Sequence, residues 1–314
     1  MDKFRVISDL HLDINARFNV SFRRDSIFTV VAGDLGGDIE QDCKWLKKNI
    51  SQGVFVAGNH IVYNASNKAL EDFKEELHAE YPKDSSITFL DESVGLVEKE
   101  VDGIVFLGST LYTDYKYKTY DYHEDDEQTI ARNMRYANLG LNDFCVGKTT
   151  RDDSLGMLYP TDYKKWHERT IAAFEDSLTR NKDKDVVIVT HHCPSPKCIS
   201  KQYVGNELNA SYVSDLEDFI QGHKNIKCWC CGHVHHKDSF KLGDCLIVMN
   251  PLGYCKYMSF SEGGRDWSFN TFVNTKTWEL EVQSCGLTKI KRAYKAERER
   301  VRKLYEDFAQ AFMI

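Results

Sequence analysis

The stretch CWCCGHVHH, residues 228–236, combines cysteine and histidine at a density typical of metal sites. Structural zinc sites favour cysteine pairs about two to four residues apart, followed by a second pair of Cys or His. The cysteines of this stretch lack that spacing, so we expect them to be small buried residues at the end of a strand. His233 and His235 lie on the same side of an extended segment, whereas His236 falls on the opposite side and is expected at the surface.

Short apolar runs of strand length recur along the chain. Their continuous apolar character is typical of strands buried on both faces, as in layered α/β folds. Stretches with apolar residues three and four apart, such as 67–81 and 166–180, predict helices between them. The runs are FRVI (4–7), IFTVVA (27–32), VFVA (54–57), IVFL (104–107), VVIV (186–189), IKCWCC (226–231) and LIVM (246–249).

Polar residues that could bind metal follow five of these runs, in SDLHLD, GDLGGD, GNH, THH and GHVH. We expect them at one edge of a sheet, where open α/β folds bind ligands. Such O and N ligands suit Mn²⁺, Fe, Zn²⁺ or Ni²⁺. Two such ions about 3.5–4 Å apart can hold both oxygens of a phosphoryl displacement and lower the pKa of a bridging water. Glycines before Asp34, Asn59 and His233 are expected to let the backbone turn sharply.

The ordered set D-x-H, G-D, G-N-H, H and G-H-x-H resembles the calcineurin-like metallophosphoesterase superfamily over residues 9–235. The stretches at 108–115, 141–144, 190–196 and 209–217 resemble a bacterial and phage-borne subgroup of phosphoesterases. The resemblance implies an α/β fold, a layered sandwich of two mixed β-sheets flanked by helices (αββα), here followed by a C-terminal helix.

The resemblance also implies roles for single residues and two divalent ions as cofactors, with Mn²⁺ favoured over Fe, Zn²⁺ or Ni²⁺. His60 matches the non-ligand histidine that donates a hydrogen bond or proton to the phosphoryl or leaving-group oxygen. His192 is expected to line the pocket. The first metal would be bound by Asp9, His11 and His235, the second by Asn59, His191 and His233, with Asp34 bridging the two.

One position departs from the family pattern. G-N-H is normally followed by Asp or Glu, whereas Ile61 follows His60 here. Because that acid is not a metal ligand, we expect metal binding to be intact. The change is either harmless or alters how His60 and its loop are held.

Residues 109–160 form a long insertion between strand-like runs, a candidate lid that is rich in tyrosine. Tyr112 and Tyr115 are candidate substrate-binding residues, because tyrosine rings near such a site could stack on a base. The alternative is that they cover the apolar edge of the fold. The acidic run at 124–127 is expected to be a solvated loop.

The domain organisation predicted from the sequence is one metallophosphoesterase domain at 1–260 and a C-terminal strand and long helix at 261–314, packed on the same domain. Residues 287–314 have apolar residues at helical spacing and a basic side. That basic side is either a solvated face, a dimer contact or a contact surface for nucleic acid.

Composition narrows the classes of function. Lys plus Arg number 41 and Asp plus Glu number 48, which gives a net charge of −7. This charge argues against a protein whose whole surface binds nucleic acid. The N-terminus lacks a signal-peptide pattern, and no apolar run is long enough to span a bilayer. The ten cysteines then predict reduced thiols in a cytoplasmic protein.

These observations predict a dinuclear-metal-dependent hydrolase of a phosphomonoester or small phosphodiester, acting by attack of metal-bound hydroxide. The expected partner is a phosphorylated small molecule or nucleotide and not a membrane, and the sequence does not fix the oligomeric state. One alternative is a nuclease that uses the same site on DNA or RNA. A second alternative is a catalytically weak phosphoesterase-like binding or scaffold protein.

Overall fold

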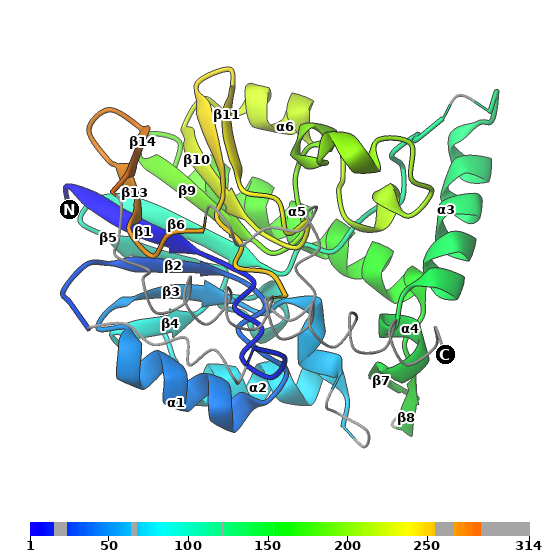
Figure 1. Ribbon diagram of the computed structural model, residues 1–314, viewed down its shortest axis with the longest axis horizontal. Coiled ribbons are helices and arrows are strands. Elements are labelled where there is room, and N and C mark those ends of the chain that lie inside the picture. The colour runs from blue at the N-terminus through cyan, green and yellow to red at the C-terminus, as the bar shows by residue number, and fades with distance from the viewer. Residues whose placement is uncertain (16–23, 64–67, 121, 153, 255–266, 284–314) are drawn as a thin grey trace, which may run out of the picture.

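The computed structural model of the chain describes residues 1–15, 24–63, 68–120, 122–152, 154–254 and 267–283. Two six-stranded sheets lie face to face, and helices cover their outer faces (Figure 1). The predicted αββα sandwich of two mixed sheets is therefore confirmed. The helix expected at 287–314 lies outside the described residues. None of the helices in the described part of the chain combines the length and the hydropathy that a bilayer crossing requires.

The first sheet contains four adjacent parallel strands, and the segments that connect them return the chain to the same edge of the sheet. Two antiparallel strands from the C-terminal part of the chain extend it beyond β1. In spatial order the strands are β14 (Glu279–Val282), β13 (Thr271–Asn274), β1 (Lys3–Ile7), β2 (Thr29–Ala32), β3 (Gly53–Val56) and β4 (Ile87–Phe89).

The second sheet also contains four parallel strands, but here one antiparallel strand lies at each edge. The strands that carry the apolar runs are central, because both of their faces are covered. In spatial order they are β11 (Asp238–Leu242), β12 (Cys245–Met249), β10 (Ile226–Cys231), β9 (Asp185–Thr190), β6 (Ile104–Ser109) and β5 (Glu98–Val101).

The apolar core has three layers, which explains the continuous apolar runs. Between the sheets, Val30 packs in the same cluster as Val187 and Cys230. Their chain neighbours point outward: Val31 faces the helices of the first sheet, and Ile188 faces those of the second. Successive side chains of a strand alternate between two faces, so each residue of such a run enters one core layer or the next.

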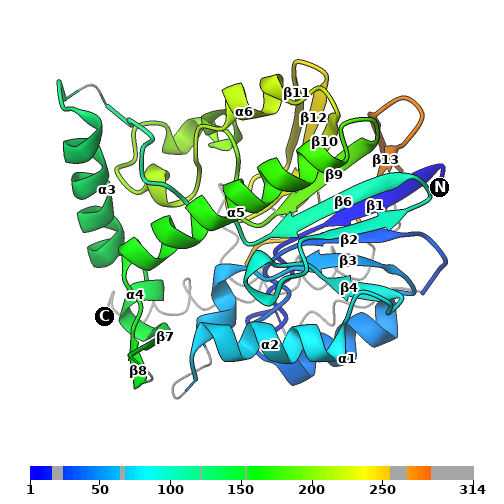
Figure 2. The same cartoon turned by 180° about the vertical axis from the view of Figure 1, so that it is seen from behind.

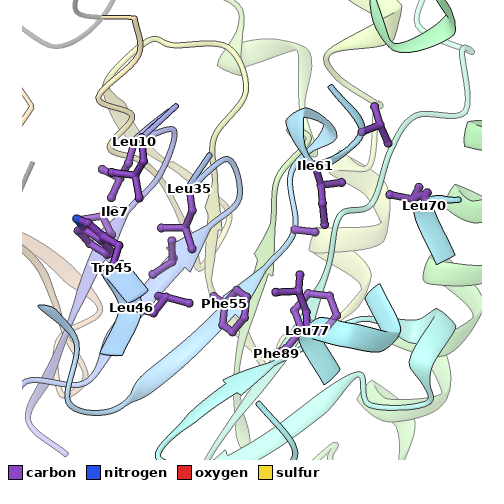
Figure 3. Packing of buried hydrophobic residues seen from close by; sticks show 14 of the residues in the cluster. Ile7, Leu10, Leu35, Trp45, Leu46, Phe55, Ile61, Leu70, Leu77 and Phe89 are labelled. Carbon is purple, nitrogen blue, oxygen red and sulfur yellow. The ribbon is translucent and has the colours of Figure 1, made fainter. Parts of the chain in front are cut away.

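Helices cover the two outer faces. Under the first sheet, Leu46 of α1 (Ile39–Asn49) and Leu77 of α2 (Leu70–Glu80) pack against strand residues such as Phe55 (Figure 3). Over the second sheet, Phe174 of α5 (Pro160–Arg180) lies in one cluster with Trp229 of β10. The short helix α6 (Glu217–Gly222) lies on the same side (Figure 2).

The segment between β6 and α5 forms a unit of its own at the end of the sandwich toward which β9 and β10 point (Figures 1 and 2). It contains α3 (Asp126–Gly140), α4 (Asp143–Val146) and a hairpin of β7 (Lys148–Arg151) and β8 (Ser154–Met157). This segment corresponds to the insertion predicted at 109–160.

The acidic run in this segment is not a loop, as the sequence had suggested, but the start of α3. The Asp125 carboxylate accepts a hydrogen bond from Gln128 N at 2.9 Å, and the Gln128 side chain accepts one from Asp125 N at 3.2 Å. Asp126 and Glu127 occupy the first turn of the helix. Negative charge is favourable there because the free N–H groups of a helix N-terminus are partly positive.

A buried ion pair ties α2 to the end of β4. Lys74 Nζ lies 2.8 Å from Asp91 Oδ2, and both side chains are almost fully inaccessible to solvent. Burial alone would lower the pKa of Lys74, but the Asp91 carboxylate, together with Tyr112 and Glu92, outweighs burial and raises it. Lys74 is therefore charged, and its charge compensates that of Asp91.

We expect Lys74→Met to lower the free energy of unfolding by about 3–5 kcal/mol, because it leaves the Asp91 carboxylate buried without a counter-charge. The measurement is urea-induced unfolding of the metal-free protein. The matched control is Lys47→Met, which breaks the exposed pair with Glu80 and should lower the free energy of unfolding far less, because water and salt screen that pair. Equal losses in the two variants would contradict the role given to the buried pair.

Candidate metal centre

The candidate ligands lie at the carboxyl ends of parallel strands from both sheets. Asp9 and His11 follow β1, and Asp34 follows β2. The short helix η2 (Asn59–Val62), directly after β3, provides Asn59 and His60. From the second sheet, β9 is followed by His191 and β10 by His233 and His235. Parallel strands end at the same edge of a sheet, so the two edges deliver these side chains to one place.

The first group of ligands consists of Asp9, His11 and His235, whose ligand atoms all lie within 4.8 Å of one another. The Nε2 atoms of His11 and His235 are 2.9 Å apart, and Asp9 Oδ1 is 3.5 Å from His235 Nε2. Asp9 Oδ1 also accepts a hydrogen bond from the backbone N of His233 at 2.9 Å.

The second group consists of Asp34, His191 and His233, again with ligand atoms within 4.8 Å. His191 Nε2 lies 3.2 Å from Asp34 Oδ2 and 3.0 Å from Asn59 Oδ1, which adds the amide oxygen to this group. Asp34 Oδ2 is also 3.8 Å from His11 Nε2. Asp34 therefore lies between the two groups, as a bridging ligand would.

These residues fit divalent metal ions by their unsatisfied atoms as well as by their types. Within the described residues, Asp9 Oδ2 and His233 Nε2 are buried and have no hydrogen-bond partner. Buried polar atoms without a partner are costly, and a bound cation would give these two atoms the partner that they lack. Carboxylate oxygen, amide oxygen and imidazole nitrogen are the donors expected for Mn²⁺, Fe, Zn²⁺ or Ni²⁺.

The protonation states of most of these groups suit metal binding. Burial would raise the pKa of Asp34, but His191 and His60 lower it well below its ordinary value, so the carboxylate is ionised. Burial holds the pKa of His11 and of His233 well below the ordinary value, so both imidazoles are neutral. His191 differs: burial would lower its pKa, but the Asp34 carboxylate raises it to about 9 in the metal-free protein.

Most of the ligands have a backbone conformation that is unfavourable for residues other than glycine. A left-handed conformation costs such a residue roughly 1–2 kcal/mol, and the surrounding fold must hold it in place. This left-handed conformation turns the chain sharply just beyond the strand that precedes each ligand. Among the candidate ligands, those with φ between 43° and 67° are Asp9, His11, Asp34, His233 and His235.

The glycines before the ligands have a role that differs from the one predicted. Only Gly33, with φ of +83°, itself provides a turn. At Gly58 a β-carbon would lie 1.9 Å from Asp34 Oδ1, and at Gly232 it would lie 2.3 Å from Asp9 Oδ2. These two positions lack a side chain because a carboxylate ligand packs directly against their α-carbons.

His60 lies beside both groups. It is in neither set of predicted ligands, but one of its ring nitrogens lies within 4.8 Å of ligand atoms of His11 and Asp34. Its Nε2 is 4.0 Å from Asp34 Oδ2, and its backbone N donates to Asp34 Oδ1 at 3.1 Å. The hydroxyl of Tyr254 lies 2.8 Å from His60 Nε2. Both side chains line a cavity of about 270 Å³ that opens onto the ligands.

The sequence matches calcineurin-like phosphoesterase over residues 3–237. The chain belongs to the calcineurin-like phosphoesterase family. It is therefore a metal-dependent phosphoric ester hydrolase, as the ordered motifs predicted. No curated protein matches the chain.

Solved structures resemble this calcineurin-like phosphoesterase in fold. The phosphopantetheinyl hydrolase PptH from Mycobacterium tuberculosis has a TM-score of 0.60 at 16% identity, covering 80% of this chain and 89% of its own. The protein TT1561 of Thermus thermophilus has a TM-score of 0.45 at 11% identity, covering 90% and 98%. A putative 5'-nucleotidase from Staphylococcus aureus has a TM-score of 0.41 at 13% identity, covering 90% and 53%.

The structure places three predicted substrate-binding residues of this phosphoesterase away from its cavity. Tyr112 and Tyr115 are 1% and 0% exposed, and neither lines the cavity. Their rings belong to the apolar cluster that packs against the first sheet, which is the alternative position that the sequence left open. His192 is also buried, between Tyr112 and His233, and its Nδ1 lies 3.3 Å from Thr110 O. It packs behind the ligands and does not line the pocket.

Two further expectations concern neighbours of the ligands. His236, expected at the surface, is partly exposed and also contributes to the cavity wall. Ile61 lies in the apolar cluster that also contains Leu70 and Leu77 (Figure 3). An acid at this position would place a carboxylate among apolar side chains, which is unfavourable unless the carboxylate finds a partner.

The structure also brings together residues that sequence reasoning missed. Cys193, Cys198 and Cys231 have sulfur atoms within 4.8 Å of one another, although their spacing predicted no such cluster. Tyr254 follows β12, a strand whose end carries none of the metal-ligating motifs. Asp143, in the LNDF stretch, lines the cavity although no role was given to it.

We expect Gly58→Ala to weaken Mn²⁺ binding by at least about tenfold, because the new methyl group would displace the Asp34 carboxylate and would also lie 2.5 Å from the Asp34 backbone N. Equilibrium dialysis followed by metal analysis measures this. The matched control is Gly222→Ala, where a β-carbon meets no atom within 4 Å. Unchanged Mn²⁺ binding in the Gly58 variant would show that Asp34 is not a ligand.

Mn²⁺ binding should also release a proton from His191. Because the pKa of His191 is raised to about 9, the imidazole is protonated at pH 7.5 and must lose this proton to become a ligand. The apparent affinity should therefore rise about tenfold per pH unit as the pH increases towards 9. Calorimetric titrations in two buffers of different ionisation enthalpy would give different heats, whereas identical heats would mean that His191 is already neutral.

Proposed function

We propose that this protein hydrolyses a phosphomonoester or a small phosphodiester at a centre of two divalent metal ions. The observation that carries the proposal is the convergence of seven O and N ligands at the strand ends, with buried ligand atoms that lack any other partner. The first ion would be held by Asp9, His11 and His235, the second by Asn59, His191 and His233, and both by Asp34.

Mn²⁺ is the ion that we propose, with Fe, Zn²⁺ or Ni²⁺ as alternatives that suit the same ligands. When bound, two such ions act as Lewis acids towards a phosphoryl group and generate a nucleophile from water near neutral pH. The chain itself keeps the ligands in place through its strained turns and excludes most solvent from them, since Asp9, His11 and His191 are fully buried.

His60 is the catalytic residue in this proposal. It lies within 4.0 Å of Asp34 Oδ2 but belongs to neither ligand set, so its Nε2 can act on the substrate instead of on an ion. The position of the Tyr254 hydroxyl, 2.8 Å from Nε2, marks where an ester oxygen would receive a hydrogen bond or proton from His60.

The cavity favours a small phosphorylated molecule or nucleotide over a polynucleotide. Its volume of about 270 Å³ suits a small ester, and tyrosine rings and side-chain amides form much of its wall, among them Tyr63, Tyr212, Gln202 and Asn206. Among the described residues that line it there is no Lys or Arg, which a nuclease would use on a phosphate backbone. A scaffold protein would not need to keep the complete ligand set.

We also propose a cytoplasmic location. All the cysteines that the structure describes are free thiols, including Cys228 and Cys230, which are adjacent on one face of β10. Free thiols at this density fit a reducing compartment.

The test is hydrolysis of p-nitrophenyl phosphate and bis-p-nitrophenyl phosphate by metal-stripped protein resupplied with Mn²⁺. We expect turnover of at least one ester, and the preferred ester distinguishes a monoesterase from a diesterase. Asp34→Asn should abolish turnover together with metal binding. His60→Gln should keep the metal but lower kcat by about 10²–10⁴-fold.

Two outcomes would contradict the proposal. One is the absence of turnover of either ester with any of the four metals, despite metal binding. The other is an Asp34→Asn variant with unchanged turnover, which would place the activity at another site.

A further inference from the structure

Asp143 is a buried acid at the cavity that no metal motif includes. It lies at the start of α4, in the inserted segment between β6 and α5, and is 2% exposed. Among the described residues no Lys or Arg forms an ion pair with it. An ionised carboxylate without a cation is costly to bury unless hydrogen-bond donors surround it.

Three side chains donate hydrogen bonds to this carboxylate. Tyr163 Oη lies 2.7 Å from Oδ1, and Tyr63 Oη lies 2.7 Å from Oδ2. The third donor is Asn59 Nδ2, 3.0 Å from Oδ1. Burial, with the nearby Asp143 charge, raises the pKa of both Tyr63 and Tyr163. Both phenols therefore keep the protons that they donate.

The hydrogen bond from Asn59 decides which end of its amide faces the metal site. A side-chain amide has an oxygen that can bind a cation and an NH₂ group that cannot. The carboxylate of Asp143 only accepts hydrogen bonds, so it selects the orientation in which Nδ2 points towards it. The Asn59 Oδ1 atom then faces His191 Nε2, at 3.0 Å.

We propose that Asp143 is a positioning residue for the second metal ion, which it serves by holding the Asn59 amide with its oxygen towards the ion. The proposal rests on the dinuclear centre proposed above. Two divalent cations there would also supply the positive charge that the surroundings of Asp143 lack.

This role also gives the inserted segment a function besides covering the cavity. The GNH stretch at 58–60 has Ile61 instead of an acid after it, and Ile61 points into the core. The carboxylate that contacts this stretch from outside the strand ends is that of Asp143, contributed by α4. Asp143, a residue of the insertion, thereby helps to position Asn59, the ligand that follows β3.

The experiment is Mn²⁺ titration of metal-free protein, followed by the EPR signal of free Mn²⁺. Asp143→Leu has a similar size but no acceptor, so the Asn59 amide can reverse. We expect it to weaken the second Mn²⁺ by about 10–100-fold and to leave the first unchanged. Asp143→Asn keeps an oxygen that can accept from Asn59, so it should restore most of the affinity for the second ion.

The matched control is Asp114→Leu, the same change at another buried acid of the inserted segment. Asp114 accepts a hydrogen bond from Lys116 N and does not line the cavity, so both Mn²⁺ affinities should be unchanged. If Asp143→Leu does not fold, as judged by circular dichroism, Asp143→Ala removes the acceptor without adding bulk and carries the same expectation.

The proposal is overturned if a folded Leu or Ala variant at position 143 binds the second Mn²⁺ as tightly as wild type. It is also overturned if both ions weaken equally, because that result means a general distortion of the site. Wild-type protein that binds two Mn²⁺ but hydrolyses no ester would contradict the proposed function alone, since the Mn²⁺ affinities that decide the role of Asp143 do not depend on turnover.

Discussion

The carboxylate of Asp34 is the feature on which the rest of the site depends. It is 2% exposed, yet it is ionised and lies within 4.0 Å of imidazole nitrogens of His11, His60 and His191. Burying such a charge is unfavourable unless positive charge or hydrogen-bond donors surround it. The first sheet provides Asp34 and the loop with His60, and the second sheet provides His191, so residues from both sheets surround this carboxylate. Divalent cations bound there would stabilise the fold as well as the site.

The site is largely formed before any ion binds. Five of the seven candidate ligands already have left-handed backbone conformations, and the carboxylates of Asp9 and Asp34 pack against glycine α-carbons that leave no room for a side chain. Strained residues persist only where the surrounding structure holds them, and such strain is common at functional sites. Little reorganisation of the chain is therefore needed on metal binding, apart from the loss of a proton by His191.

The fold, and the meeting of the candidate ligands at one place, could be predicted from the sequence because both follow from local patterns. Continuous apolar runs indicate strands buried on both faces, and a polar residue directly after such a run, such as Asp34 or His191, must lie near the sheet edge. Asp143 could not be found in this way, because its contact with Asn59 joins residues 84 positions apart through an insertion whose path has no sequence pattern. The same difficulty applies to Tyr112 and Tyr115: their position in the sequence did not reveal that their rings are buried in the apolar cluster beside the first sheet.

The most direct test of two ions at this centre is anomalous X-ray diffraction from crystals of the protein soaked in Mn²⁺. The account predicts two peaks at the strand ends, one beside Asp9, His11 and His235 and one beside Asn59, His191 and His233, with the Asp34 carboxylate in contact with both. A single peak, or peaks that Asp34 does not contact, would contradict it.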